Sequence, residues 1–497
     1  MKKTFATITL AALVLVAFML YRAGTVFQDH QFAPATGITE VKLNEAGATQ
    51  RFSQALTFPT VSYDDRSNFD AAAFLDFHAF LQSSYPLIHE HTRRTIVNDY
   101  SLVYHLPGSD PTLEPVLFMS HMDVVPIEES TRDEWTHPPF EGVVRNDIIW
   151  GRGSVDDKIG VISLMEAMEL LLSENVRPAR SVYLAFGHDE EVGGKDGAAR
   201  VAEYFASQGI RFDFVLDEGG VVTQGMIMDI ERPIAVIGVS EKGYVNLLLT
   251  VNAPGGHSSQ PPEHTAVGIL SRAIVRVEDN PFAARLGPIV QTFEAIGNEA
   301  PFTTRLAMSN LWLLSALVKK ELLSDHNSAA GIRTTTAATM VSGSPKANIL
   351  PTRATAVINF RIIPGETVDS VRQRVVQIID DERVMVSDEY GTNPSPVSPT
   401  DSRGYGMIAS IIRAMDENIL VAPYMVRGGT DAKYFYPLSH NVYRFLMVQI
   451  NAKTMNYVHG IDERMPVKDY LQAIRFYYHL MRQSMNTEDI PGAAGNA

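Results

Sequence analysis

The order of hydrophobic and polar positions separates an N-terminal apolar segment from the rest of the chain. Residues 4–21, TFATITLAALVLVAFMLY, carry no charge, follow Lys2 and Lys3, and are closed by Arg22. This length crosses a bilayer at the short end of the usual range. Residues 1–22 are therefore expected to form an uncleaved membrane anchor, with a cleaved signal segment as the alternative.

The charges around this segment predict its orientation. Lys2 and Lys3 favour the cytoplasmic side, so the body of an anchored protein would lie on the periplasmic, lumenal or extracellular side. Cleavage of the segment would instead give a secreted protein, and a buried N-terminal helix of a soluble domain is a third option. The polar stretch 23–46 is expected to be a tether.

Short apolar runs alternate with helix-like stretches over residues 47–241. The runs SLVYHL, PVLFMSHMDVVP, SVYLAF and DFVLDEGG are rich in β-branched and aromatic residues, which predicts strands. The segment KIGVISLMEAMELLLSENV has apolar residues at helical spacing. This order predicts an α/β fold, with a mostly parallel sheet covered by helices on both faces. The same pattern resumes over 393–485.

Residues 242–392 have a different pattern. Four segments predict half-buried strands (YVNLLLTV, TTAATMV, RATAVINFRI and VMVSDEY), and TAVGILSRAIVRVED and TVDSVRQRVVQIID predict amphipathic helices. The order βαββαβ favours a ferredoxin-like two-layer insert. Within it, the apolar stretch 301–323 is typical of a core or lid-packing helix, and the alternative is the wall of an acyl pocket. The last segment, 486–497, is expected to be a tail without regular structure.

The composition excludes several classes of function. The chain has 497 residues and a formal net charge of −15, with no basic run beyond the N-terminus. Nucleic-acid binding, which needs a cationic surface, is therefore not expected. Cysteine is absent, so a metal site in this chain must use histidine and carboxylate ligands.

Acidic residues and histidines collect where predicted strands end or helices begin. These residues are His121 and Asp123, Asp156 and Asp157, the run His188 to Glu191, Asp217 and Glu218, and His459. Each group alone is explained by a solvated turn. Together they lie where ligands gather in open parallel sheets, and they are what a hydrolytic zinc site uses. A bound cation would also explain how the crowded carboxylates are tolerated.

The motifs SHMDVVP, GRGSVDDKIG, FGHDEEVGG, LDEGG, GGHSS and HGIDE resemble the successive signatures of the di-zinc aminoacylase and carboxypeptidase family. The resemblance covers about residues 50–480, and is nearest the branch of carboxypeptidase S and the N-fatty-acyl-amino-acid hydrolases. It implies a zinc-peptidase-like catalytic domain over 47–241 and 393–485. It also implies two Zn²⁺ ions per chain and a lid domain over 242–392 that can pair two chains into a homodimer.

The resemblance implies a role for each metal ligand. His121 would bind one zinc ion, His459 the other, and Asp156 would bridge them. Glu191 would complete the His459 site. The LDEGG motif would complete the His121 site through Glu218, with Asp217 as the close alternative. Members of the family also carry a cis peptide bond after the bridging aspartate.

The remaining roles concern catalysis and substrate binding. The resemblance implies that Glu190 is the general base and later protonates the leaving amine, that Asp123 orients His121, and that His257 stabilises the oxyanion, often in the partner subunit. Asn348 and Arg361 would contact the substrate, with Arg361 gripping its carboxylate. The loop at Gly428, Gly429 and Thr430 would close over that carboxylate with backbone and hydroxyl donors.

The resemblance therefore implies a zinc-dependent hydrolase that cleaves an amide next to a free C-terminal carboxylate. The substrate would be a small peptide, as for a carboxypeptidase or dipeptidase. The alternative is an N-acyl amino acid, as for an aminoacylase. A hypothesis from another class is a catalytically silent binding protein on the same fold, which would lack a ligand or the base.

Overall fold

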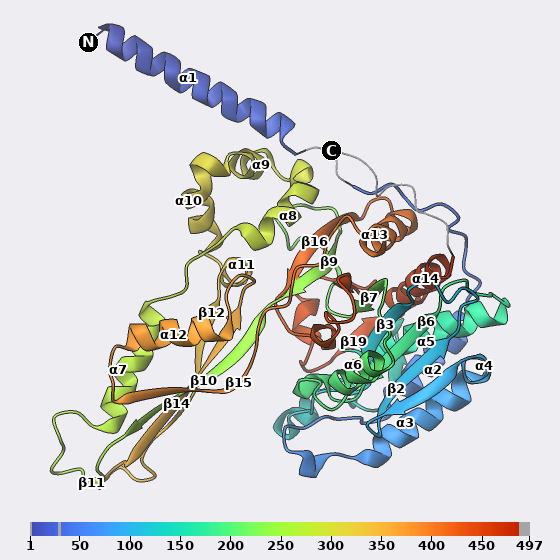
Figure 1. Ribbon diagram of the computed structural model, residues 1–497, viewed down its shortest axis with the longest axis horizontal. Coiled ribbons are helices and arrows are strands. Elements are labelled where there is room, and N and C mark those ends of the chain that lie inside the picture. The colour runs from blue at the N-terminus through green and yellow to red at the C-terminus, as the bar shows by residue number, and fades with distance from the viewer. Residues whose placement is uncertain (1, 28–30, 487–497) are drawn as a thin grey trace.

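The computed structural model describes residues 2–27 and 31–486, and it contains a large and a small sheet between which the chain crosses twice (Figure 1). The tail predicted for 486–497 lies outside the described residues except for Asn486. The long helix α1 (Lys2–Thr25) extends away from the body (Figure 1). It is the one helix of the described chain that is long and apolar enough to cross a membrane, with a mean hydropathy of 2.2 over its most apolar part.

The large sheet has ten strands in the described chain, and most of the central ones run parallel. In spatial order they are β1 (Arg93–Val97), β2 (Ser101–Leu106), β6 (Val182–Gly187), β3 (Val116–His121), β7 (Phe214–Asp217), β17 (Val442–Arg444), β9 (Ile234–Glu241), β8 (Val222–Thr223) and β18 (Gln449–Ile450), with β16 (Leu420–Val426) also paired to β9. A separate three-stranded sheet contains β4 (Val143–Arg145), β5 (Ile148–Trp150) and β19 (Arg464–Pro466).

Helices cover both faces of the large sheet, as the sequence predicts. They are α2 (Glu45–Ala55), α3 (Ala71–Ser84), α4 (Pro86–His91), α5 (Lys158–Ser173), α6 (Ala198–Ser207), α13 (Arg403–Met415) and α14 (Val467–Ser484). Successive β3 residues point to opposite faces. Val116 and Phe118 join the core formed with α2, α3, α5, α13 and α14. Leu117 and Met119 join the core formed with α6. The apolar run of β3 is continuous because both faces are buried.

The small sheet is antiparallel and has the strand order β12 (Thr335–Ser342), β14 (Arg353–Ile362), β10 (Gly243–Asn252) and β15 (Val384–Thr392). Helices α7 (Ala266–Asp279) and α12 (Val368–Ile379) share a hydrophobic core with it. This is the βαββαβ arrangement that the sequence predicts. Near its far tip, the two-residue strands β11 (Gly256–His257) and β13 (Ile349–Leu350) pair with each other (Figure 1).

The two sheets are connected almost without a linker. Strand β9 ends at Glu241 and β10 begins at Gly243, so Lys242 alone separates a strand of the large sheet from one of the small sheet (Figure 1). The chain returns after Thr392, the last residue of β15. The domain limits at 241/242 and 392/393 stay predictions.

A helical group is inserted between α7 and β12. It comprises α8 (Gly287–Ile296), α9 (Phe302–Ser309), α10 (Leu311–Leu322) and α11 (His326–Ile332). Helices α9 and α10 make up the stretch 301–323, which lies on the surface at the base of α1 and does not enter the large core (Figure 1).

Short 3₁₀ helices span Arg66–Asn68, Glu129–Glu134, Glu190–Val192, Gly297–Glu299, Asp431–Tyr434 and Thr454–Tyr457.

Candidate functional site

The carboxyl ends of three neighbouring parallel strands bring the predicted metal ligands to one edge of the large sheet. His121 ends β3, Asp217 ends β7, and Glu190 follows β6 by three residues. Both β6 and β7 pair in parallel with β3. Asp156 comes from the loop before α5 and His459 from the loop before β19. Residues far apart in the sequence meet here because parallel strands end at the same edge.

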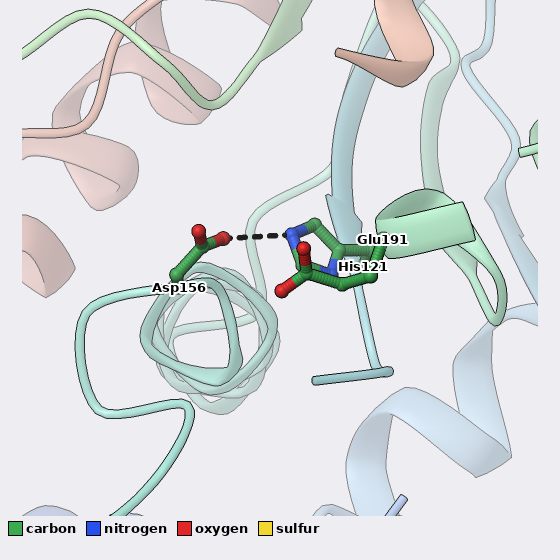
Figure 2. A group of neighbouring side chains, drawn as sticks. All are labelled: His121, Asp156 and Glu191. Carbon is green, nitrogen blue, oxygen red and sulfur yellow. Dashed lines mark hydrogen bonds and ion pairs between the residues drawn. The ribbon is translucent and has the colours of Figure 1, made fainter. Parts of the chain in front are cut away.

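Asp156 lies between the two histidines. Its Oδ1 is 3.0 Å from His121 Nε2, and its Oδ2 is 3.0 Å from His459 Nε2. Glu191 Oε2 lies 3.1 Å from His459 Nε2. His121, Asp156 and Glu191 each offer one ligand atom, and these atoms lie within 4.8 Å of one another (Figure 2). The donor types and spacing suit zinc, which binds such ligands at about 2.0–2.2 Å. The peptide bond between Asp156 and Asp157 is cis.

The two acids of the LDEGG motif occupy different environments. Glu218 lines the same cavity as Asp156, Glu191 and His459. The Asp217 side chain is buried, and its Oδ2 accepts a hydrogen bond of 2.7 Å from the backbone N–H of the 3₁₀ helix at 431–434. The open carboxylate is thus that of Glu218, whereas Asp217 fixes the backbone behind the cavity.

Asp123 connects the histidine ligand to the acids after β6. It is fully buried; its carbonyl oxygen is 3.0 Å from His121 Nδ1, and its carboxylate is 3.4 Å from the same nitrogen. The carboxylate also accepts the backbone N–H groups of Glu190 and Glu191, each at 3.1 Å, and the hydroxyl of Ser62. With Nδ1 held in this way, Nε2 of His121 is the nitrogen that faces Asp156 and can bind a metal.

The protein itself only partly neutralises the negative charge of the carboxylates at this edge. Burial and the neighbouring Asp156 carboxylate raise the pKa of Glu191 to about 7, and burial raises the pKa values of Glu190 and Glu218 well above their usual range. Burial also opposes ionisation of Asp156, but hydrogen bonds with His121 and His459 outweigh it and lower the pKa. Hydrogen bonds with Asp156 and Glu191 raise the pKa of His459 to about 10. Crowded carboxylates of this kind favour a bound cation.

A cavity of about 750 Å³ opens over these ligands and extends to the small sheet. The strand ends and loops of the large sheet contribute Asp156, Glu190, Glu191, Glu218 and His459, with Lys433 of the 3₁₀ helix at 431–434 close to Glu190. The small sheet and its junction contribute Lys242, Tyr244, Arg361 and Tyr390. Acidic and basic side chains therefore face one cavity from two different sheets. The predicted residues Arg361, Gly428, Gly429 and Thr430 all line it.

The basic wall contains groups that the sequence motifs did not single out. Lys242 is 4% exposed at the junction of the sheets and donates to the carbonyl of Arg333 at 2.9 Å. Burial and the nearby Arg427 and Arg361 lower the pKa of Lys242 to about 7. The Arg361 guanidinium stands 4.7 Å from the centre of the Tyr244 ring. Lys242 has no motif of its own, and only the sheet junction reveals its position.

The loop predicted to close over a substrate carboxylate is only partly available for that purpose. Gly428 and Gly429 are exposed at the cavity. Thr430 is buried, and its N–H and hydroxyl both donate to Glu241 Oε2, at 2.9 and 3.1 Å. The donors of Thr430 thus bind the loop to the end of β9.

His257 and Asn348 lie together, but away from the cavity. His257 ends β11, is exposed, and has its Nδ1 2.8 Å from Ser259 Oγ. The Ser258 N–H donates to the Asn348 carbonyl at 3.1 Å. Strand β11, which contains His257 and pairs with β13 directly after Asn348, lies at the tip of the small sheet, apart from the large sheet (Figure 1). Neither lines the cavity in this arrangement of the chain.

The first two residues of the run His188 to Glu191 have structural partners. His188 Nδ1 is 2.7 Å from Ser101 Oγ, and the ring packs among aromatic side chains. Asp189 accepts the N–H groups of Asp196 and Gly197 at 2.8 and 2.7 Å. Of the four adjacent ionisable groups, these two therefore brace the loop, while Glu190 and Glu191 face the cavity.

Comparison with known proteins agrees with this arrangement. The chain is 38% identical over 451 residues to "Probable carboxypeptidase S-like 2" of Dictyostelium discoideum, covering 90% of this chain and 86% of the relative. It is 35% identical over 493 residues to the human "N-fatty-acyl-amino acid synthase/hydrolase PM20D1", covering 96% and 97%. A solved M20 family metallo-carboxypeptidase from Sulfolobus solfataricus superposes with a TM-score of 0.62 at 17% identity, covering 88% of this chain and 99% of that one.

The fold of that carboxypeptidase is the fold of this chain, with a mostly parallel central sheet and a separate small antiparallel sheet. The model of the family described as "Peptidase family M20/M25/M40" matches residues 117–483. These residues include the acids and histidines at the edge of the large sheet. The chain therefore belongs to peptidase family M20/M25/M40 and is a metallohydrolase.

Proposed function

We propose that the protein is a di-zinc hydrolase of the carboxypeptidase type, which cleaves the amide bond next to a free carboxylate and releases an amino acid. The observation that carries this proposal is the single cavity with histidine and acidic side chains on one wall and Arg361 and Lys242 on the other. The acidic wall suits metal ions, and the basic wall suits a substrate carboxylate.

The donor set fits two zinc ions. His121, Asp156 and Glu218 would hold one ion, and Asp156, Glu191 and His459 the other. Glu191 Oε1 is buried without a hydrogen-bond partner among the described residues, which supports a ligand outside the protein. Bound zinc would polarise the scissile carbonyl and lower the pKa of a water molecule. In that state both histidines would be neutral, and the ions would offset the negative charge of the carboxylates.

Glu190 is the proposed general base. It lines the cavity beside Glu191, and its backbone N–H is held by Asp123. Burial and the nearby acids raise its pKa, which suits a group that takes a proton from water and returns it to the leaving amine. Asp123 would act as a positioning residue, because the same carboxylate orients His121 and fixes the start of the Glu190–Val192 turn.

Arg361 and Lys242 are the proposed partners of the substrate carboxylate. Both line the cavity from the small sheet or its junction, opposite the proposed metal ligands. Arg361 offers the planar fork that pairs with a carboxylate in two hydrogen bonds. Because the proposed metal ligands and Arg361 belong to different sheets, the distance between the two sheets would limit the length of the substrate.

N-acyl-amino-acid hydrolysis is the second candidate activity. The human relative named as an N-fatty-acyl-amino acid synthase/hydrolase is aligned over nearly the whole chain. An N-acyl amino acid has the same amide and carboxylate as a dipeptide, but an alkyl chain replaces the N-terminal residue. A binding protein without activity is disfavoured because the donors for both ions and the base Glu190 are present.

We further propose that α1 is a membrane anchor with the catalytic body on the non-cytoplasmic side. Its 24 residues span about 36 Å, enough for a hydrocarbon core of about 30 Å. The apolar side chains of α1 are largely exposed, as lipid contact requires. Lys2 and Lys3 precede the apolar stretch and favour the cytoplasm. A cleaved signal segment would predict a mature N-terminus beyond residue 22.

The test uses the full chain in detergent, loaded with zinc, and two substrates with the same C-terminal amino acid. One is a dipeptide and the other a long-chain N-acyl amino acid. We expect release of the amino acid from at least one, loss to background with a chelator, and return when Zn²⁺ is restored. The preferred substrate decides between the two activities. Two bound zinc ions with no release from either substrate would overturn the proposal and favour a binding function.

A further inference from the structure

The helical group at the base of α1 presents an apolar face that the rest of the described chain leaves largely exposed, with Phe18 of α1 against its Trp312. The residues of α10 on that face are Trp312, Leu313, Ala316, Leu317 and Lys320, all exposed. Trp312 is 55% exposed and Leu317 59%. At 100° per residue these positions fall on one side of the helix, whereas the buried Val318 lies on the opposite side.

This face is continuous with the lower end of the proposed anchor. The ring of Trp312 lies 6.1 Å from that of Phe18 in α1. Asn310, between α9 and α10, donates to the Met19 carbonyl at 3.1 Å, and Arg22 donates to the Ser309 carbonyl at 2.9 Å. Helix α9 therefore packs against the end of α1, and α10 contacts α1 through the ring of Trp312.

The base of α1 is also fixed to the interior of the helical group. Phe27, two residues after α1, is buried in a cluster with Phe293, Met308 and Val318. The inner side of α10 thus holds the anchor while its outer side remains apolar and exposed. An anchor attached in this way sets the depth of α10 relative to a bilayer.

That depth suits the membrane–water boundary. Phe18 precedes Tyr21, the end of the apolar stretch, by three residues, or about 5 Å along the helix. Amphipathic helices that lie on a membrane bury their apolar face by about 5–10 Å, with tryptophan at the headgroup level. Lys320, on the same face as Trp312, and the neighbouring Lys319 supply cations that can reach lipid phosphates.

We propose that α10 is a membrane-docking helix, whose face of Trp312, Leu313 and Leu317 lies in the outer headgroup region of the bilayer that α1 crosses. The docked helix would hold the body in one orientation on the membrane, which a single flexible tether does not. This inference rests on the proposed anchoring by α1 and is independent of the proposed hydrolysis.

The test is fluorescence quenching of the full chain reconstituted in phosphatidylcholine vesicles whose acyl chains carry bromine near the headgroup. Trp135 and Trp150 belong to the catalytic body, so Trp312 is the tryptophan next to α1. We expect bromine to quench the wild type, and Trp312→Phe to remove at least half of that quenching. The proposal is overturned if the two proteins lose the same fraction of their emission.

A second pair of variants keeps Trp312 and changes the face around it. Leu317→Glu should reduce the quenching several-fold, whereas Leu75→Glu, at a similarly exposed apolar position on α3, should leave it unchanged. Retention after carbonate extraction shows separately that α1 is inserted, and substrate turnover tests the hydrolase. Emission that shifts with the protein-to-lipid ratio, without bromine quenching, would mean that a second copy covers the face, and would overturn lipid docking.

Discussion

The cavity at the edge of the large sheet and the tip of the small sheet carry residues of one predicted site in opposite surroundings. Around the cavity, His121 and Asp123 are buried and Asp156 contacts both histidines within a single chain. At the tip, His257 is exposed and bonds only to its own loop. The first group is assembled by one fold, whereas the second needs another surface, or a movement of the small sheet, to reach a substrate.

The largest expected effect concerns the proposed base. Glu190→Gln removes the group that accepts and returns the proton, so we expect kcat to fall by about 10²–10⁴-fold. Zinc content, measured by mass spectrometry, should not change, because Glu190 is not among the proposed ligands. Glu203→Gln, on the exposed side of α6, is the matched control. Near-normal turnover by Glu190→Gln would refute the base assignment.

The next effect tests whether the exposed tip belongs to the active site. His257→Ala removes the proposed oxyanion donor, so kcat should fall by about 10²–10³-fold. If the histidine acts in the partner subunit, mixing this variant with Glu190→Gln recovers activity, because one site of each mixed dimer has both residues. Random pairing of equal amounts gives about a quarter of the wild-type rate.

The two controls for this experiment are each variant alone. A large loss for His257→Ala with no recovery on mixing would mean that the small sheet moves toward the cavity of its own chain. An unchanged kcat for His257→Ala would remove the tip from the catalytic mechanism. The first result would keep the tip in the active site of its own chain, and the second would leave the cavity as the whole active site.

The smallest effect concerns the basic wall of the cavity. Arg361→Lys keeps the charge but removes the planar fork, so we expect KM for substrates with a free carboxylate to rise by about tenfold and kcat to change little. The matched substrate is the same molecule with its carboxylate esterified. An equal rise in KM for the ester would show that Arg361 does not bind the carboxylate.

Much of the fold can be predicted from the sequence because its hydrophobic residues recur at clear helical or strand spacing. Continuous apolar runs such as that of β3 indicate strands buried on both faces, and the α/β order indicates a parallel sheet. The βαββαβ order of 242–392 likewise predicts the small antiparallel sheet. The stretch 301–323 is the exception, because an apolar face looks the same in a sequence whether it meets a core or remains exposed, as Trp312 does.

The motifs identify the acids and histidines, but their division into roles depends on three-dimensional contacts. Adjacent residues illustrate this: Asp189 caps the next loop, Glu190 faces the cavity, and Glu191 contacts His459. The resemblance favours Glu218 as the ligand and leaves Asp217 as the close alternative, and only Glu218 lines the cavity. The donors of Thr430, expected for substrate, are instead occupied by Glu241.

The sequence by itself determined the apolar N-terminal segment, the two-sheet architecture and the set of donor residues, since each depends on local composition or on motifs. Only the tertiary structure decided which donors meet, that Lys242 joins Arg361 opposite the acids, and that His257 lies apart from them. The physical reason is that a local pattern specifies which face of an element is buried. It does not specify which distant segment lies against that element. Asp156 and His459, for example, are in contact although 303 positions separate them in the sequence.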